Sequence, residues 1–111
     1  YPAEQIETIR GVHELLTRDL SSRITIDELS RRAHMNPSTL KTLFKAVDGQ
    51  SIAAHAKEHR MEKAASLLKE TNASIAEISA AVGYESQSKF TAEFRKAFQM
   101  SPTEYRKRTR K

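Results

Sequence analysis

The chain has 111 residues, 38% of them hydrophobic and 30% charged, which is enough for one domain with a modest core. It has no cysteine, which excludes disulfides and thiolate metal sites, and no signal-peptide pattern or apolar run near the ~20 residues that span a bilayer. The excess positive charge behind the net charge of +5 lies after residue 40. It predicts an anionic partner, with nucleic acid favoured over a membrane surface. A charged surface that serves only solubility has the same composition.

The first half of the chain predicts three helices. Apolar residues at i, i+3 and i+4 spacing place the first helix over residues 3–20. The capping-box pattern TIDE at residues 25–28 opens a second, short helix. Asn36 and Pro37 open a third helix, which ends near Gly49. The residues expected to face the core are Ile6, Ile9, Val12, Leu16 and Leu20, then Ile26, Leu29 and Ala33, and then Leu40, Leu43, Phe44 and Val47.

The second half predicts four more helices, so the expected fold is all-α with seven helices. No helix breaker occurs over residues 51–71, which predicts a rod of roughly 30 Å at a rise of 1.5 Å per residue. Ser74 opens a second capping box, and Gly83 ends the short helix that follows it. A sixth helix comes next, and the pattern SPTE at residues 101–104 is a third capping box that opens a seventh helix. The apolar stripes of these helices are Ile52, Ala56, Met61, Ala64, Ala65 and Leu68, then Ile75, Ile78 and Val82, then Phe90, Phe94, Ala97 and Phe98, and finally Tyr105.

The chain contains one unit twice. A shift of 49 residues places the helix that opens at Thr25 on the helix that opens at Ser74. One extra residue enters near residues 85–87, and beyond it a shift of 50 places Phe44 on Phe94. Each unit is a capped short helix, a tight turn and a second amphipathic helix, which is the helix-turn-helix pattern. An ordinary corner between two helices of a bundle would look the same in one copy, but two copies on a rod favour the helix-turn-helix interpretation.

These units predict a division into a first lobe at residues 1–50, a linker helix at 51–71 and a second lobe at 72–111. Recognition helices in successive major grooves of one duplex face must lie about 34 Å apart, close to the length of the predicted rod, although a helical spacer has other uses. Hydroxyl, amide and ammonium groups, which bond base edges and phosphates, dominate the faces of both second helices once the buried stripes are removed. These faces carry Ser38, Thr39, Lys41, Thr42 and Lys45 in the first lobe, and Gln87, Ser88, Lys89, Thr91, Ala92, Glu93, Arg95 and Lys96 in the second.

The segment IAEISAAVGYESQSKFTAEFRKAFQMSPTEYR at residues 75–106 resembles the signature of the AraC/XylS family of bacterial transcription regulators. The segment RMEKAASLL at residues 60–68 resembles the linker-helix pattern of that family, and the match covers about residues 6–106. The resemblance implies seven helices in two helix-turn-helix lobes on a linker helix, with recognition helices in successive major grooves. The characteristic positions are occupied by Ala81, Gly83, Tyr84, Ser86, Phe90, Phe94, Lys96, Ser101, Pro102, Tyr105 and Arg106.

The contact residues come from the resemblance, position by position, and from the polar faces described above, which alone supply Lys45, Gln87, Arg95 and Lys96. Base contacts are expected from Ser38, Thr39, Lys41 and Thr42 in the first lobe, and from Gln87, Ser88, Lys89, Thr91 and Ala92 in the second. Phosphate contacts are expected from Lys45, Arg95 and Lys96, and from the helix starts at Thr25 and Ser74, because helix N-termini bind phosphate.

Three features depart from the family pattern. Thr42 and Ala92 are shorter than the Arg or Gln that members often carry there, and Ser38 is small where an aromatic or larger group can occur. These substitutions put direct base readout at those positions in doubt. Gln99 replaces the usual Gly before the seventh helix, and a non-Gly residue in a left-handed conformation costs about 1 kcal/mol or more. A different turn is therefore expected there.

The resemblance also implies partners and setting. They are double-stranded DNA, RNA polymerase at activated promoters, an effector bound by a separate N-terminal domain, and the bacterial cytoplasm. No enzyme activity, metal or cofactor is implied. Because the chain begins at Tyr1 without Met, we expect it to be a piece of a longer protein.

Two other interpretations of the sequence remain open. HAKEH at residues 55–59 matches a zinc-hydrolase pattern, but spacing suggests no third ligand, and His55 occupies the slot that Tyr105 fills in the repeat, which indicates packing. Alternatively, the domain is a helical protein-interaction module whose five cationic residues within 106–111 bind acidic partners or lipid.

Overall fold

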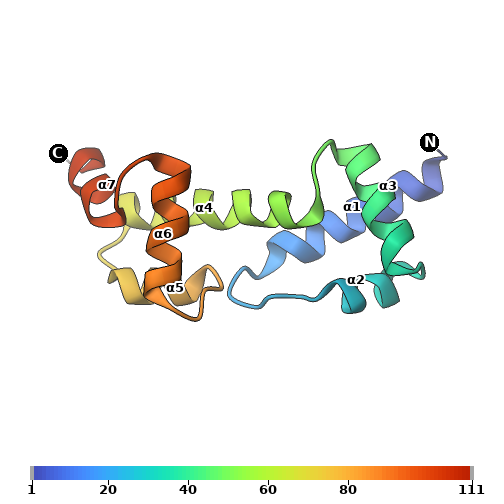
Figure 1. The fold of residues 1–111 in the computed structure, drawn as a ribbon, viewed down its shortest axis with the longest axis horizontal. Helices are drawn as coiled ribbons and strands as arrows, with labels where there is room; N and C mark the ends of the chain where they lie inside the picture. Colours follow the sequence, from blue (N-terminus) through green and yellow to red (C-terminus); the bar gives the residue numbers. More distant parts are fainter. Residues whose placement is uncertain (1, 111) are drawn as a thin grey trace. The chain divides into compact units, whose positions relative to one another are not determined.

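The computed structural model describes residues 2–110, and within them seven α-helices and no strand are present (Figure 1). The predicted all-α class and the predicted helix count are confirmed. The helices are α1 (Ala3–Arg18), α2 (Ile26–Ala33), α3 (Pro37–Asp48), α4 (Ile52–Glu70), α5 (Ile75–Ala81), α6 (Gln87–Phe98) and α7 (Pro102–Thr109). Their bounds agree with the predicted ones to within about two residues. None of these helices has the length and apolarity needed to cross a membrane.

The chain forms two compact units. The first comprises the residues up to Asp19 together with Arg23–Lys57, and the second comprises Leu20–Ser22 together with the residues from Glu58 onward. In the first unit α1, α2 and α3 pack on one another, and in the second α6 packs on both α5 and α7. Helix α4 supplies residues to both units. The predicted division of the chain at residues 50 and 71 stays a prediction.

Each unit has its own apolar core, and the predicted stripes supply nearly all of both. The first core consists of Ile9, Val12, Leu16, Leu29, Leu40, Leu43, Phe44 and Ile52. The second consists of Met61, Ala64, Ala65, Leu68, Ile78, Val82, Tyr84, Phe90 and Phe94.

Three stripe residues were predicted wrongly. Ile6 is exposed on the first turns of α1. Ala97 is exposed, while its neighbour Phe98 is half-buried and its ring contacts that of Tyr105 in α7. Leu20 lies beyond the end of α1, is half-buried and belongs to the second unit.

Ring packing shows that the two units repeat in space as well as in sequence. In the first unit the His55 ring meets the Phe44 ring edge-on, with centroids 5.6 Å apart and an interplanar angle of 72°. In the second unit Tyr105 meets Phe94 at 5.4 Å and 78°. His55 therefore does pack in the slot that Tyr105 fills, as the repeat predicted.

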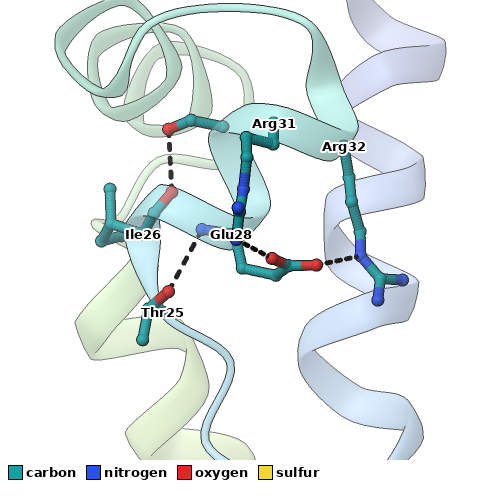
Figure 2. Close-up of polar contacts among 6 residues, drawn as sticks. Thr25, Ile26, Glu28, Arg31 and Arg32 are labelled. Atoms are coloured by element: carbon teal, nitrogen blue, oxygen red, sulfur yellow. Dashed lines mark hydrogen bonds and ion pairs between the residues drawn. The ribbon is translucent and has the colours of Figure 1, made fainter.

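Every helix start except that of α1 is capped by a side chain, although only one of the three predicted capping boxes closes fully. At α5 the Ser74 hydroxyl accepts from the Glu77 N–H at 3.0 Å, and the Glu77 carboxylate accepts from the Ser74 N–H at 2.9 Å. At α2 the Thr25 hydroxyl accepts from the Glu28 N–H, but the Glu28 carboxylate turns to Arg31 and Arg32 (Figure 2). An Arg one turn further along the helix thus outcompetes the backbone N–H for the carboxylate.

The seventh helix shows the same competition. The Ser101 hydroxyl accepts from the Glu104 N–H, while the Glu104 carboxylate pairs with Arg108 at 3.0 Å. The predicted capping boxes at α2 and α7 are therefore only half-formed. Asn36, which the sequence places at the start of α3, accepts from the third amide of that helix, and Ser86, a cap that the sequence did not predict, does the same in α6.

A residue in the left-handed conformation ends one helix in each unit. In the first unit this residue is a glycine, and at the equivalent position of the second unit it is not. After α3 the left-handed residue is Gly49, with φ 93°, and after α6 it is Gln99, with φ 60°. Both donate their N–H to the carbonyl four residues earlier, at 2.9 Å from Gly49 and 2.8 Å from Gln99. The expectation of a different turn at Gln99 was wrong, since the left-handed cap is kept without glycine.

We expect Gln99→Gly to stabilise the protein. A left-handed residue that carries a Cβ costs about 1 kcal/mol relative to glycine, so the free energy of unfolding should rise by about 0.5–1 kcal/mol in urea denaturation. Gly49→Gln is the matched control, because an added Cβ there meets no atom within 4 Å and only the backbone cost remains. It should lower stability by a similar amount. A decrease with Gln99→Gly would contradict the cap's energetic role.

The capping box at α5 should make stability depend on pH. The Ser74 N–H that donates to Glu77 holds the pKa of this carboxyl below its ordinary value. A depressed folded-state pKa contributes stability above the unfolded pKa and loses it as the pH falls through the folded pKa. Glu77→Gln keeps an acceptor for the N–H but has no charge to titrate. Urea midpoints measured from neutral pH to about pH 3 should therefore fall less steeply in this variant than in the parent chain. Parallel curves would contradict this.

Candidate nucleic-acid interface

In the first unit α2, a short turn and α3 form a helix-turn-helix. His34 follows α2 in the left-handed conformation, with φ 56°, and lets the chain turn. The next residue, Met35, donates its N–H to the Ser30 carbonyl at 3.1 Å, and Asn36 then caps α3. This repeats the second unit, where the Tyr84 N–H donates to Ser79 at 3.0 Å.

The second turn is built around a buried glycine. Gly83, with φ 87°, lies where a Cβ would collide with the Arg60 guanidinium and the Leu20 carbonyl. The same guanidinium donates to the Leu20 carbonyl and, at 2.8 Å, to the carbonyl of Val82, so it satisfies the end of α5. The sequence places Gly83 at the end of this short helix, and the positive φ of Gly83 is what allows the turn there. Arg60 was not recognised as a positioning residue, because a lone Arg in a helical sequence is usually exposed.

All predicted contact residues of α3 are exposed. Leu40, Leu43 and Phe44 point into the core and fix the rotation of the helix about its axis. The opposite face consequently carries Ser38, Thr39, Lys41, Thr42 and Lys45, all of them exposed. These side chains offer hydroxyl donors and acceptors together with ammonium groups, which suit base edges and phosphates.

Helix α6 presents an equivalent face. Phe90 and Phe94 anchor it to the core. An open hollow on its surface is lined by Gln87, Ser88, Thr91, Ala92, Arg95 and Lys96, which brings six predicted site residues together. Thr91 is half-buried and the other five are exposed. Lys89 is exposed but does not line this hollow, and Lys96 lies 3.6 Å from the Glu93 carboxylate.

The short side chain of Ala92 has a structural consequence here. It lies in the hollow between Ser88 and Arg95, so the face is concave where a long side chain would fill it. Direct hydrogen bonding from this position is impossible, because a methyl group neither donates nor accepts. Its available contribution is apolar contact, for example with the methyl group of thymine.

The two helix starts predicted to bind phosphate differ in charge. Thr25 and Ser74 are both exposed, and the hydroxyl of each is used as a cap. At α5 the Glu77 carboxylate lies against the Ser74 N–H, so the end of the helix carries a negative charge that opposes phosphate. At α2 two arginines neutralise the Glu28 carboxylate, and the hydrogen bond from Arg32 and the charge of Arg31 lower its pKa. Of the two sites, Thr25 is the better suited to an anion.

The cationic tail is partly used by the fold. Arg106 donates from Nε to the Leu68 carbonyl at 3.0 Å and from Nη2 to that of Thr71 at 3.2 Å. Arg110 donates to the Thr71 carbonyl as well, and Arg108 pairs with Glu104. These cations cap the end of α4 and brace α7, while Lys111 lies outside the described residues. An interaction module that relies on a free cationic tail is therefore disfavoured.

Comparisons with known proteins agree with this geometry. Residues 29–108 match the family model of a helix-turn-helix domain. The C-terminal domain of AraT, a response regulator from Geobacillus stearothermophilus, superposes with a TM-score of 0.89 at 30% identity, covering 94% of this chain and 87% of that one. The DNA-binding domain of AdpA, a global transcriptional factor solved in complex with a target DNA, shares the fold with a TM-score of 0.80 at 22% identity, over 96% and 93% of the chains.

A curated relative agrees as well. A putative AraC-like transcription regulator from Streptomyces lividans is 38% identical over 83% of the chain. The chain spans 30% of the length of that relative, and 13% and 37% of two other curated regulators.

We expect Gly83→Ala to destabilise the second unit strongly. The substitution adds a left-handed penalty and a clash with the Leu20 backbone, so the loss should be about 2 kcal/mol or more in urea denaturation. Gly11→Ala is the matched control, because Gly11 lies inside α1 with open space around it. That change should stabilise the protein by about 0.5–1 kcal/mol. Equal effects of the two substitutions would remove the special role of the turn.

Proposed function

The chain is an AraC-family DNA-binding transcriptional regulator domain, and from this premise we propose that α3 and α6 each read base edges in a major groove of duplex DNA. Its relatives are transcription regulators and not enzymes. The observation that carries the proposal is the orientation of α6. Two buried phenylalanines hold it, and its outer face gathers hydroxyl, amide and cationic groups in one hollow.

Within this face we assign two roles. Gln87, Ser88, Lys89, Thr91 and Ala92 lie in the first half of α6, where recognition helices meet base edges. Arg95 and Lys96 lie in its last turn, where a cation suits the phosphate backbone. By the repeat, Ser38, Thr39, Lys41 and Thr42 take the first role in α3, and Lys45 takes the second. Thr25 is the phosphate-binding helix start that we favour over Ser74.

The proposed setting follows the family. The two recognition helices enter successive major grooves, as the resemblance implies. Among the curated relatives, RhaR from Mannheimia succiniciproducens is a transcriptional activator, 29% identical over 93% of this chain, and it supports RNA polymerase as a partner at activated promoters. Regulation by an effector bound to a separate domain, and action in the bacterial cytoplasm where the DNA lies, belong to the same proposal.

A selected operator allows the two roles within α6 to be tested. Duplexes selected from a random library define the operator, and binding is then measured for point variants of each half-site across a salt series. Lys89→Ala should weaken binding to the preferred sequence by about 1–3 kcal/mol and relax the base preference at one or two base pairs. Arg95→Ala should weaken binding to all sequences about equally. It should also reduce the magnitude of the slope of log binding constant against log salt concentration by about 0.9.

Lys69→Ala serves as the control, because it removes the same charge from an exposed position on α4, outside both recognition faces. It should leave base preference unchanged. If Lys89→Ala lowered the affinity for all duplex sequences equally, Lys89 would be a phosphate contact and not a base contact. Binding that disappears under modest competitor DNA would contradict sequence-specific recognition altogether.

A further inference from the structure

A cluster of two imidazoles and one carboxylate lies in the first unit. His13 comes from the middle of α1, Asp48 is the last residue of α3, and His55 lies in the first turns of α4. The His13 Nε2 atom lies 2.6 Å from Asp48 Oδ1, and the His55 Nδ1 atom lies 3.4 Å from Asp48 Oδ2. The three residues offer one ligand atom each, and these atoms all lie within 4.8 Å of one another.

We propose that His13, Asp48 and His55 form a binding site for a divalent transition metal, with Zn²⁺ as the best-matched ion. Imidazole nitrogen and carboxylate oxygen are ligands that Zn²⁺ takes at about 2.0–2.2 Å, so small side-chain movements bring the three donors onto one ion. Three protein ligands leave a further position for water or an outside ligand. The donor set contains no thiolate, which excludes the soft sites that prefer Cu(I).

Burial supports a ligand at this place. The side chains of Asp48 and His55 are only 13% and 10% exposed, whereas His13 is 32% exposed and leaves a path from solvent. Within residues 2–110 the buried Asp48 Oδ2 accepts no hydrogen bond. The nearest contact given for this oxygen is the His55 Nδ1 atom at 3.4 Å. A buried carboxylate oxygen that accepts no hydrogen bond is costly, and a metal ion would satisfy it.

The internal repeat provides a second, independent argument. An offset of 50 residues places Asp48 on Phe98 and His55 on Tyr105. In the second unit these two positions hold aromatic rings in contact, with centroids 5.2 Å apart. The fold is therefore satisfied by apolar rings at this point, and the first unit carries a polar pair in the same slots. Packing alone does not require a carboxylate and an imidazole there.

The site differs from the H-x-x-E-H pattern of the sequence. That pattern pairs His55 with His59, but in the structure His55 meets His13 and Asp48 instead. The first and last of the three ligands, His13 and His55, are 42 residues apart in the sequence, so no short sequence motif contains the site. A metal here would join α1 to the end of α3 and the start of α4, and would stabilise the first unit by mass action.

Metal titration of the chain tests the proposal. Zn²⁺ titrated by calorimetry should bind at one equivalent per chain and raise the melting temperature. Co²⁺ should give the intense visible bands of a low-coordinate site, and NMR should show perturbed ring resonances of His13 and His55 alone among the four histidines. His13→Gln and Asp48→Asn remove one ligand each while roughly keeping side-chain size. Each should lower the affinity for Zn²⁺ by about tenfold or more.

His59→Gln is the matched control and should bind Zn²⁺ like the parent chain. The proposal is overturned if the parent chain shows neither a Zn²⁺-dependent rise in melting temperature nor Co²⁺ bands. It is also overturned if the His59 ring shifts while that of His13 does not. The ring resonances of the parent chain decide the question even if a substituted chain fails to fold.

Discussion

A left-handed residue in the turn after the first helix of each helix-turn-helix is the constraint on which the rest depends. It reverses the chain within a few residues, so that the second helix can leave at a steep angle and still bury its own apolar stripe. In the first unit this residue is His34, which is exposed, and in the second it is Gly83, which is buried. The difference has a physical cause, because the Arg60 guanidinium and the Leu20 carbonyl occupy the space that a side chain at Gly83 would need.

The two units solve one packing problem with different residues. A glycine ends α3 where Gln99 ends α6, and His34 turns the first unit where Gly83 turns the second. Asp48 and His55 likewise stand where Phe98 and Tyr105 stand in the other copy. Backbone geometry is kept at all four positions, while side-chain chemistry has diverged. Comparison of the two copies thus distinguishes the backbone conformations that the fold requires from the side chains that are specific to one unit.

The outward faces of α3 and α6 owe their position to core residues and helix caps. Buried leucine and phenylalanine side chains set the rotation of α3 and α6, and caps at Asn36 and Ser86 set where these helices begin. Some of the cationic side chains are meanwhile used by the fold itself. Arg60, Arg106 and Arg110 donate to backbone carbonyls, so net charge by itself overstates the cations that remain for a phosphate backbone.

The sequence by itself determined the seven helices, the repeated helix-turn-helix and the outward faces of α3 and α6. Each of these follows from apolar periodicity and capping residues that act over a few positions. Only the tertiary structure decided that Arg60 holds the second turn, and that Ala97 is exposed while Phe98 is half-buried. The meeting of His13, Asp48 and His55 belongs to the same group. These outcomes depend on which distant atoms come within hydrogen-bonding or packing distance, and local periodicity carries no information about that.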